Sequence, residues 1–146
     1  MTFRDERVRA AVEERFVPLS LDLFRDPREW LRPLGVIWTP TILFLDRRGA
    51  VRYQSPDYLP PELFLDLLDL GDGHVALHWA WFTEAARLFA RVATREPVSP
   101  WAPEAHYWWG VAVYLATRSR DELERVWKSL RERFPQSIWA ARARTD

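Results

Sequence analysis

The spacing of hydrophobic and polar positions changes near the middle of the chain. Over residues 1–72, stretches with helical spacing are interleaved with short apolar runs that are typical of strands. After Gly73 apolar residues recur only at helical spacing, and no strand pattern is found. Gly71-Asp72-Gly73 is the strongest break between the two patterns. The sequence therefore predicts the class α/β plus α, with an α/β unit over 1–72 and a helical unit over 73–146.

In the first unit the pattern predicts alternating helices and strands. Phe16 to Leu23 alternates like a strand, with the polar Ser20 and Asp22 on one face. Asp26-Pro27 is typical of a helix start, because Asp caps well and Pro suits the first helical position. The expected elements are a helix over 4–15, a strand over 16–23, a helix to Leu34 that Gly35 ends, a strand over 38–45, a turn over 46–49, a return strand over 50–54 and a helix from 60 to about 70.

The strand predicted over 38–45 begins with an unusual sequence, Trp38-Thr39-Pro40. Proline removes a backbone donor and is normally kept out of sheet interiors. A Thr-Pro step that leads straight into a strand favours a cis peptide bond. The following Ile42-Leu43-Phe44-Leu45 is apolar on both faces, which predicts a sheet covered on both sides.

The helical unit contains an internal repeat. Helices are expected over 74–95, 102–117 and 120–134, with a short one from Ser137. Pro97, Ser99 and Trp101 recur as Pro135, Ser137 and Trp139, an offset of 38 residues (135 minus 97). Ala85 and Phe89 pair with Leu123 and Trp127 at the same offset, and Gly110 stands where two helices pack closely. This pattern resembles tetratricopeptide repeats, although its spacing is longer than their usual ~34 residues. The resemblance implies a helical-hairpin unit.

A series of short motifs runs through the first 70 residues in a specific order. They are Phe3-Arg4-Asp5-Glu6-Arg7-Val8, Phe16-Val17-Pro18-Leu19-Ser20-Leu21-Asp22, Gly35-Val36 before Thr39-Pro40-Thr41, Phe44-Leu45-Asp46 with Gly49, and Tyr58-Leu59-Pro60-Pro61-Glu62-Leu63-Phe64. Together they resemble the C-terminal two-thirds of bacterial thioredoxin-like proteins and cover about half of the chain. The resemblance implies a thioredoxin-like fold truncated at its N-terminus, in which Pro40 occupies the family's cis-proline position.

The chain departs from this family in one decisive respect, because it contains no cysteine. The family places its central first strand and Cys-x-x-Cys just before the position of Phe3. Without thiols the nucleophile and the resolving group are missing, so the chain as given is expected to be redox-inactive and to have no catalytic residue. Either the redox segment lies upstream of Met1, or this is a short variant. In a short variant the strands at 17–23 and 40–45 pair directly, or a second chain fills the gap.

Composition excludes several classes of partner. Basic and acidic residues balance at 21 each, which gives no support for binding nucleic acid or an anionic membrane. No apolar stretch reaches the length of a membrane span, and the N-terminus has no signal-peptide core. Taken as written, the chain is expected to be cytoplasmic, or periplasmic or secreted if a signal lies upstream of Met1. No cofactor is expected.

The histidines and one aspartate are weaker candidates for a site. His74 and His78 share a helix face near Asp72 and have a spacing that suits zinc, but a polar helix start explains them better, so no metal site is expected. His106 lies among aromatic residues and is expected to be packed with its hydrogen bonds satisfied. Asp22 is a candidate buried proton carrier, although solvent exposure or capping is the commoner role.

The first functional hypothesis is therefore a thioredoxin-like protein related to bacterial thiol–disulfide oxidoreductases that binds a protein or peptide without exchanging disulfides. The resemblance places Trp38, Thr39 and Pro40 beside an extended peptide, bound by strand addition. The alternative is a non-enzymatic scaffold of the tetratricopeptide type. An incomplete sheet edge also predicts a homodimer through that edge.

Overall fold

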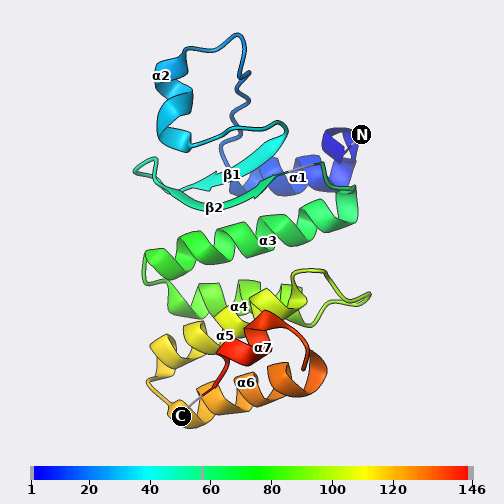
Figure 1. Ribbon diagram of the computed structural model, residues 1–146, viewed down its shortest axis with the longest axis vertical. Coiled ribbons are helices and arrows are strands. Elements are labelled where there is room, and N and C mark those ends of the chain that lie inside the picture. Colours follow the sequence, from blue (N-terminus) through cyan, green and yellow to red (C-terminus); the bar gives the residue numbers. More distant parts are fainter. Residues whose placement is uncertain (1, 57, 145–146) are drawn as a thin grey trace. The chain divides into compact units, whose positions relative to one another are not determined.

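The computed structural model describes residues 2–56 and 58–144 (Figure 1). The protein is mixed α/β and mostly helical, and its chain divides into two compact units, Met1–Leu68 and Asp69–Asp146. The division falls within α3. The elements of the described residues are, in order, η1 (Thr2–Arg4), α1 (Glu6–Arg15), α2 (Arg28–Leu31), η2 (Arg32–Leu34), β1 (Thr41–Leu45), β2 (Val51–Pro56), α3 (Pro61–His78), α4 (Phe82–Ala93), α5 (Ala102–Thr117), α6 (Arg120–Arg133) and α7 (Ile138–Arg142).

Helix α1 confirms the first predicted helix and begins at a side-chain cap. The carboxylate of Asp5 accepts hydrogen bonds from the backbone N–H groups of Arg7, at 2.9 Å, and Val8, at 3.4 Å. Such a cap satisfies donors that have no partner within the helix. Val8 is fully buried, whereas most of the helix is charged and faces solvent.

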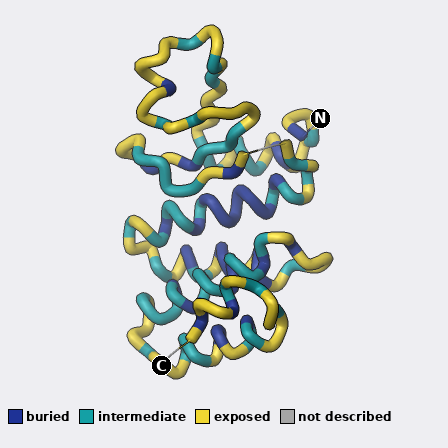
Figure 2. The backbone as a smooth tube through the Cα atoms, in the orientation of Figure 1, coloured by how far each residue is buried: buried dark blue, intermediate teal, exposed yellow. Residues whose placement is uncertain are grey.

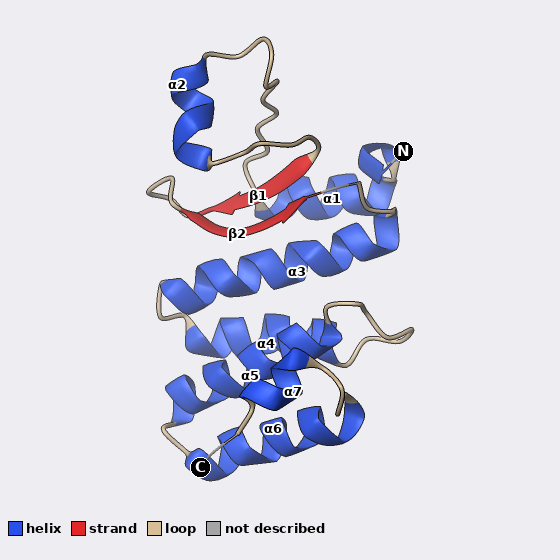
Figure 3. Cartoon of the chain, viewed as in Figure 1, coloured by secondary structure: helices blue, strands red, loops and turns tan. Residues whose placement is uncertain are grey.

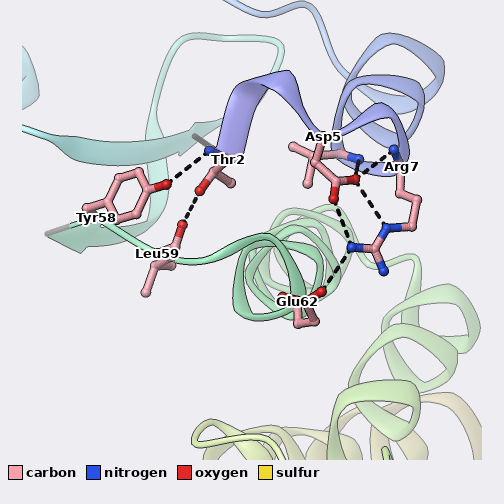
Figure 4. A network of polar contacts seen from close by, with 7 residues as sticks. Thr2, Asp5, Arg7, Tyr58, Leu59 and Glu62 are labelled. Carbon is pink, nitrogen blue, oxygen red and sulfur yellow. Dashed lines mark hydrogen bonds and ion pairs between the residues drawn. The ribbon is translucent and has the colours of Figure 1, made fainter.

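A polar network ties the N-terminal segment to the start of α3 (Figure 4). The backbone N–H of Thr2 donates to the Tyr58 hydroxyl at 3.0 Å, and the Thr2 hydroxyl donates to the carbonyl of Leu59. Arg7 bridges Asp5, at 2.8 Å, and Glu62, at 2.9 Å. The side-chain hydrogen bond from Arg7 lowers the pKa of Asp5 to about 2. These contacts fix α1 against α3 within the first unit.

Strands β1 and β2 form the predicted antiparallel hairpin, with Leu43 opposite Gln54 and an irregularity between Phe44 and Leu45. The first strand begins at Thr41 and not at Trp38 as predicted. The Asp46 side chain organises the turn: it accepts from the backbone N–H groups of Arg48, at 2.8 Å, and Ala50, at 3.1 Å. The Arg52 guanidinium donates to the same carboxylate at 2.7 Å. Gly49 has a φ of 79°, the left-handed conformation that the turn prediction required.

The segment between α1 and β1 differs in part from expectation. The predicted helix to Leu34 is present as α2 and η2, and Gly35 ends it with a φ of 64°. Its predicted start is wrong: Pro27 precedes the helix, no side chain caps it, and the Asp26 carboxylate instead accepts from the backbone N–H of Asp22.

The strand predicted over 16–23 is also wrong, since this part of the described chain is irregular. Pro18 has no N–H to give to a sheet. The Asp22 carboxylate accepts from the backbone N–H groups of Phe24, at 2.8 Å, and Arg25, at 3.2 Å, which folds the chain into a turn. Direct pairing of 17–23 with β1, as one form of a short variant required, is therefore absent from the described residues.

Helix α3 corrects a third expectation, because Gly71-Asp72-Gly73 does not end a helix. The helix runs unbroken from Pro61 to His78. Gly73 is buried, and a Cβ placed on it would lie 2.8 Å from Cε1 of Phe89 in α4. Its lack of a side chain allows close packing and does not mark a turn.

Helices α5, α6 and α7 confirm the helices expected over 102–117, 120–134 and from Ser137, and no strand occurs in the described part of the second half, 69–144. The single helix expected over 74–95 is wrong, because α3 ends at His78 and α4 begins at Phe82, with Ala80 between them at a φ of 60°. Helix α4 packs on α5, α5 packs on α6, and α7 contacts both α5 and α6. Ser137 caps α7, because its hydroxyl accepts from the backbone N–H of Ala140 at 3.0 Å. The residues buried at the end of this unit are Trp127, Leu130, Ala140 and Ala143.

Gly110 and Trp127 make the closest approach between α5 and α6. A Cβ on Gly110 would lie 2.5 Å from both Cδ1 and Nε1 of Trp127. The indole cannot easily move away, because its N–H donates to the Tyr107 carbonyl at 3.1 Å and its ring stacks on the Tyr107 ring at 5.0 Å. The contact of Gly73 with Phe89 is the corresponding contact between α3 and α4.

We predict that Gly110→Ala destabilises the protein, although alanine is by itself the better helix former by about 1 kcal/mol. Overpacking against a held ring costs about 1–3 kcal/mol. Chemical denaturation should therefore show a net loss in the free energy of unfolding. In a Trp127→Leu background the same glycine substitution should be neutral or stabilising. A loss of equal size in both backgrounds would contradict the assigned contact.

Candidate functional site

The candidate site is the outer edge of β1 together with the residues that lead into it. Among the described residues, β1 pairs only with β2. Its other edge therefore presents backbone N–H and C=O groups that are not used by a neighbouring strand. Unpaired backbone groups beside apolar side chains are the arrangement to which an additional strand binds.

Trp38, Thr39 and Pro40 lie together at the start of this edge. The Thr39-Pro40 peptide bond is cis, as the sequence predicted. The Thr41 hydroxyl donates to the Trp38 carbonyl at 2.7 Å, which holds the bend closed just before β1 begins. All three residues are exposed, and the Trp38 side chain retains 63% of its accessible surface.

Large apolar side chains are exposed in the connection that leads from α1 to β1. Ile37 is 95% exposed and Phe24 is 94% exposed, and Val17 and Leu19 also face solvent. Figure 2 shows most of the connection between α1 and β1 as exposed. Sequence reasoning selected Trp38 and not these residues, and it assigned Val17 and Leu19 to a strand that the structure does not contain.

The groups present at this edge can form main-chain hydrogen bonds and apolar contacts. Backbone amides, the Thr39 and Thr41 hydroxyls, an indole and aliphatic side chains are present, while the sequence has no cysteine to act as a thiol nucleophile. Asp22, the candidate proton carrier, is exposed and forms a turn. No group of three His, Asp or Glu residues within 2–56 and 58–144 is arranged to hold a metal ion.

The far end of β1 is fixed by the Asp46 carboxylate, which is buried. Burial acts to raise the pKa of this group, but the hydrogen bonds from Arg52 and from the backbone N–H groups of Arg48 and Ala50 prevail and lower it to about 2. The turn therefore keeps its negative acceptor at neutral pH. The Asp46 hydrogen bonds fix the C-terminal end of β1. The hydrogen bond from the Thr41 hydroxyl to the Trp38 carbonyl fixes its N-terminal end.

His74 and His78 do not form a pair. The His74 ring packs against Phe89, with centroids 5.1 Å apart, and Trp108, at 5.3 Å. Its Nε2 lies 3.6 Å from a carboxylate oxygen of Glu104 in α5. His78 is exposed at the end of α3. The helix spacing that suggested zinc therefore coincides with one histidine that packs against α4 and α5 and one that faces solvent.

His106 is packed among aromatic rings, as expected, but its hydrogen bonds are not satisfied. Only 1% of the residue is exposed, and its ring lies 5.2 Å from Trp109 and 6.4 Å from Phe134. Neither ring nitrogen has a hydrogen-bond partner among the described residues. Burial and the charge of Arg133 lower the pKa of His106 to about 4.

We predict that the second unit loses stability on acidification through His106. A histidine titrates near 6.5 in the unfolded chain, so its contribution is complete above that pH and is lost as pH falls toward 4. The largest loss is roughly 3 kcal/mol. Urea unfolding of His106→Leu should show a shallower pH dependence than the wild type over this window, whereas the exposed control His78→Gln should follow the wild type. Parallel curves for wild type and His106→Leu would contradict the prediction.

Comparison with known proteins adds no relative to this picture. No family model matches the chain, and neither a curated protein nor a solved structure matches it. Within the described residues, no helix is both long and apolar enough to cross a membrane. The thioredoxin-like and tetratricopeptide-like resemblances therefore rest on the motifs of the sequence, and the site is interpreted from its own geometry.

Proposed function

We propose that this protein is a thioredoxin-like binding protein, redox-inactive as given, that takes up an extended polypeptide segment along the open edge of β1. The observation that carries this proposal is the coincidence of an unpaired strand edge with an exposed tryptophan at its entrance. Main-chain hydrogen bonds to β1 supply affinity, and side-chain contacts with Trp38 and its apolar neighbours supply selectivity.

The local geometry supports an edge that is prepared before the ligand arrives. The Thr41-to-Trp38 hydrogen bond and the buried Asp46 acceptor constrain the two ends of β1. A strand held in its bound conformation loses less conformational entropy on binding than a flexible one. The incoming segment therefore meets a backbone that is already extended and a tryptophan that is already placed.

The alternative, a tetratricopeptide-type scaffold, draws its support from the second unit. Its glycine-to-aromatic packing recurs between successive helices, as repeat units require. Its tryptophans, however, are used largely inside the unit: Trp127 is buried and bonded to Tyr107, and Trp139 packs on Tyr107 at 5.4 Å. Trp81 is the exposed exception. The β1 edge accordingly offers the larger group of unused apolar side chains.

We predict that Trp38→Ala weakens peptide binding by roughly tenfold or more, because a desolvated tryptophan typically contributes over 1 kcal/mol at an interface. The probe is a fluorescein-labelled, lysine-flanked peptide of about eight alternating valine and threonine residues, a length that matches a short strand. Fluorescence anisotropy gives the dissociation constant.

The matched control is Trp30→Ala, since Trp30 lies in α2 and is similarly exposed at 56%. It should leave affinity unchanged. A charge on the edge, Leu45→Lys, should weaken binding as Trp38→Ala does. Equal effects of the two tryptophan substitutions, or no measurable binding by the wild type, would overturn the proposal.

A further inference from the structure

We propose that the segment which covers the β1 edge in solution is β1 of a second copy of this chain, paired antiparallel about a two-fold axis near Leu43. This inference rests on the proposed function, because it assigns an occupant to the same edge. It would join two hairpins into one continuous four-stranded sheet.

The composition of the two strands distinguishes the free edge of β1 from that of β2. Natural edge strands avoid association through charged residues and proline. β2 has these features, because Arg52 lies within it and Pro56 ends it. β1 consists of Thr41-Ile42-Leu43-Phe44-Leu45, without charge, proline or glycine. The open edge of β1 therefore lacks the charged residues and proline that would discourage its pairing with another strand.

Two-fold symmetry makes the ends of β1 complementary. In an antiparallel pair centred on Leu43, the C-terminal end of one strand lies beside the N-terminal end of the other. Arg47 and Arg48 lie in the turn after β1, beyond Asp46, and the exposed Trp38 precedes the strand. In this register Arg48 of one copy falls level with Trp38 of the other, a pair of residue types that can form a cation–π contact. The same contact forms twice, because the interface is isologous.

The exposed apolar surface near β1 and the net charge of the chain both favour pairing with a second copy. Five residues of strand pairing alone fall short of the roughly 1,200 Å² that a specific interface buries. The exposed Val17, Leu19, Phe24, Ile37 and Trp38 provide further apolar surface. Figure 3 shows the connection that carries them on the β1 side of the hairpin, away from β2. The formal net charge of zero also means that no net repulsion opposes self-association.

The absence of cysteine makes this proposal directly testable by cross-linking. Directly opposed residues of antiparallel strands are about 4.5–5.5 Å apart at Cα, within the range that a disulfide spans. In the full chain, Leu43→Cys should form an intermolecular disulfide under mild oxidation. Thr41→Cys should not, because in this register residue 41 lies opposite residue 45 and about 13 Å from its own equivalent.

The matched control is Gln54→Cys, which places a thiol on the exposed position of β2 opposite Leu43. We expect the Leu43→Cys dimer to form at least tenfold faster than the Gln54→Cys dimer. Sedimentation velocity of the cysteine-free chain should show a dimer whose dissociation constant rises at least tenfold in Leu45→Lys. Circular dichroism of each variant verifies that the hairpin remains folded.

The results separate the two proposals. Fast cross-linking at position 43, with dissociation of the dimer by the valine–threonine peptide, supports both. Cross-linking no faster than in Gln54→Cys, together with a monomer that binds the peptide, overturns the second copy as occupant and leaves the proposed function standing. A monomer that binds no peptide overturns both.

Discussion

The structure of the first unit depends on one requirement, that the backbone groups of β1 find partners. A two-stranded hairpin is marginal by itself, and β1 meets β2 along one edge only within the described residues. Hydrogen bonds at both ends of β1 stabilise the hairpin. The Thr41 hydroxyl donates to the Trp38 carbonyl, and the buried Asp46 carboxylate accepts from the backbone N–H groups of Arg48 and Ala50. Phe44, the buried residue of β1, packs against Phe16, with ring centroids 5.7 Å apart. The other edge of β1 has no strand partner among the described residues, and the proposed function assigns a polypeptide ligand to it.

The second unit is organised by a different constraint, which is close approach between helices. Gly73 and Gly110 each face an aromatic ring on the following helix, Phe89 and Trp127 respectively. The two rings are 38 residues apart (127 minus 89), the offset of the sequence repeat, and the two glycines are 37 apart (110 minus 73). The aromatic side chains of this unit are directed largely into helix packing. The open backbone groups of the first unit and the filled core of the second are the reason for assigning binding to the first.

Sequence predicted the local structure best where a residue type has one strong physical consequence. Gly35 and Gly49 end a helix and form a turn with positive φ, and Pro40 follows a cis bond, all as expected. The sequence-based predictions were wrong where the structure of a segment depends on residues that are distant in the chain. Alternation over 16–23 suggested a strand, but a strand needs a partner, and neither β1 nor β2 supplies one. Gly73 was taken for a break because the Phe89 ring that requires a small residue there lies in another helix. The site was predicted at Trp38, Thr39 and Pro40, while its exposed neighbours depended on how the irregular segment folds.

The claim that β1 has an open edge is tested most directly by amide hydrogen exchange measured residue by residue with NMR. In dilute, peptide-free protein, the amides of β1 that point toward β2 should be protected and the alternate amides should exchange rapidly. Adding the valine–threonine peptide, or raising the protein concentration, should slow exchange at those alternate amides alone. Uniform protection along β1 in dilute protein, or alternate amides that stay rapid under both conditions, would contradict the account.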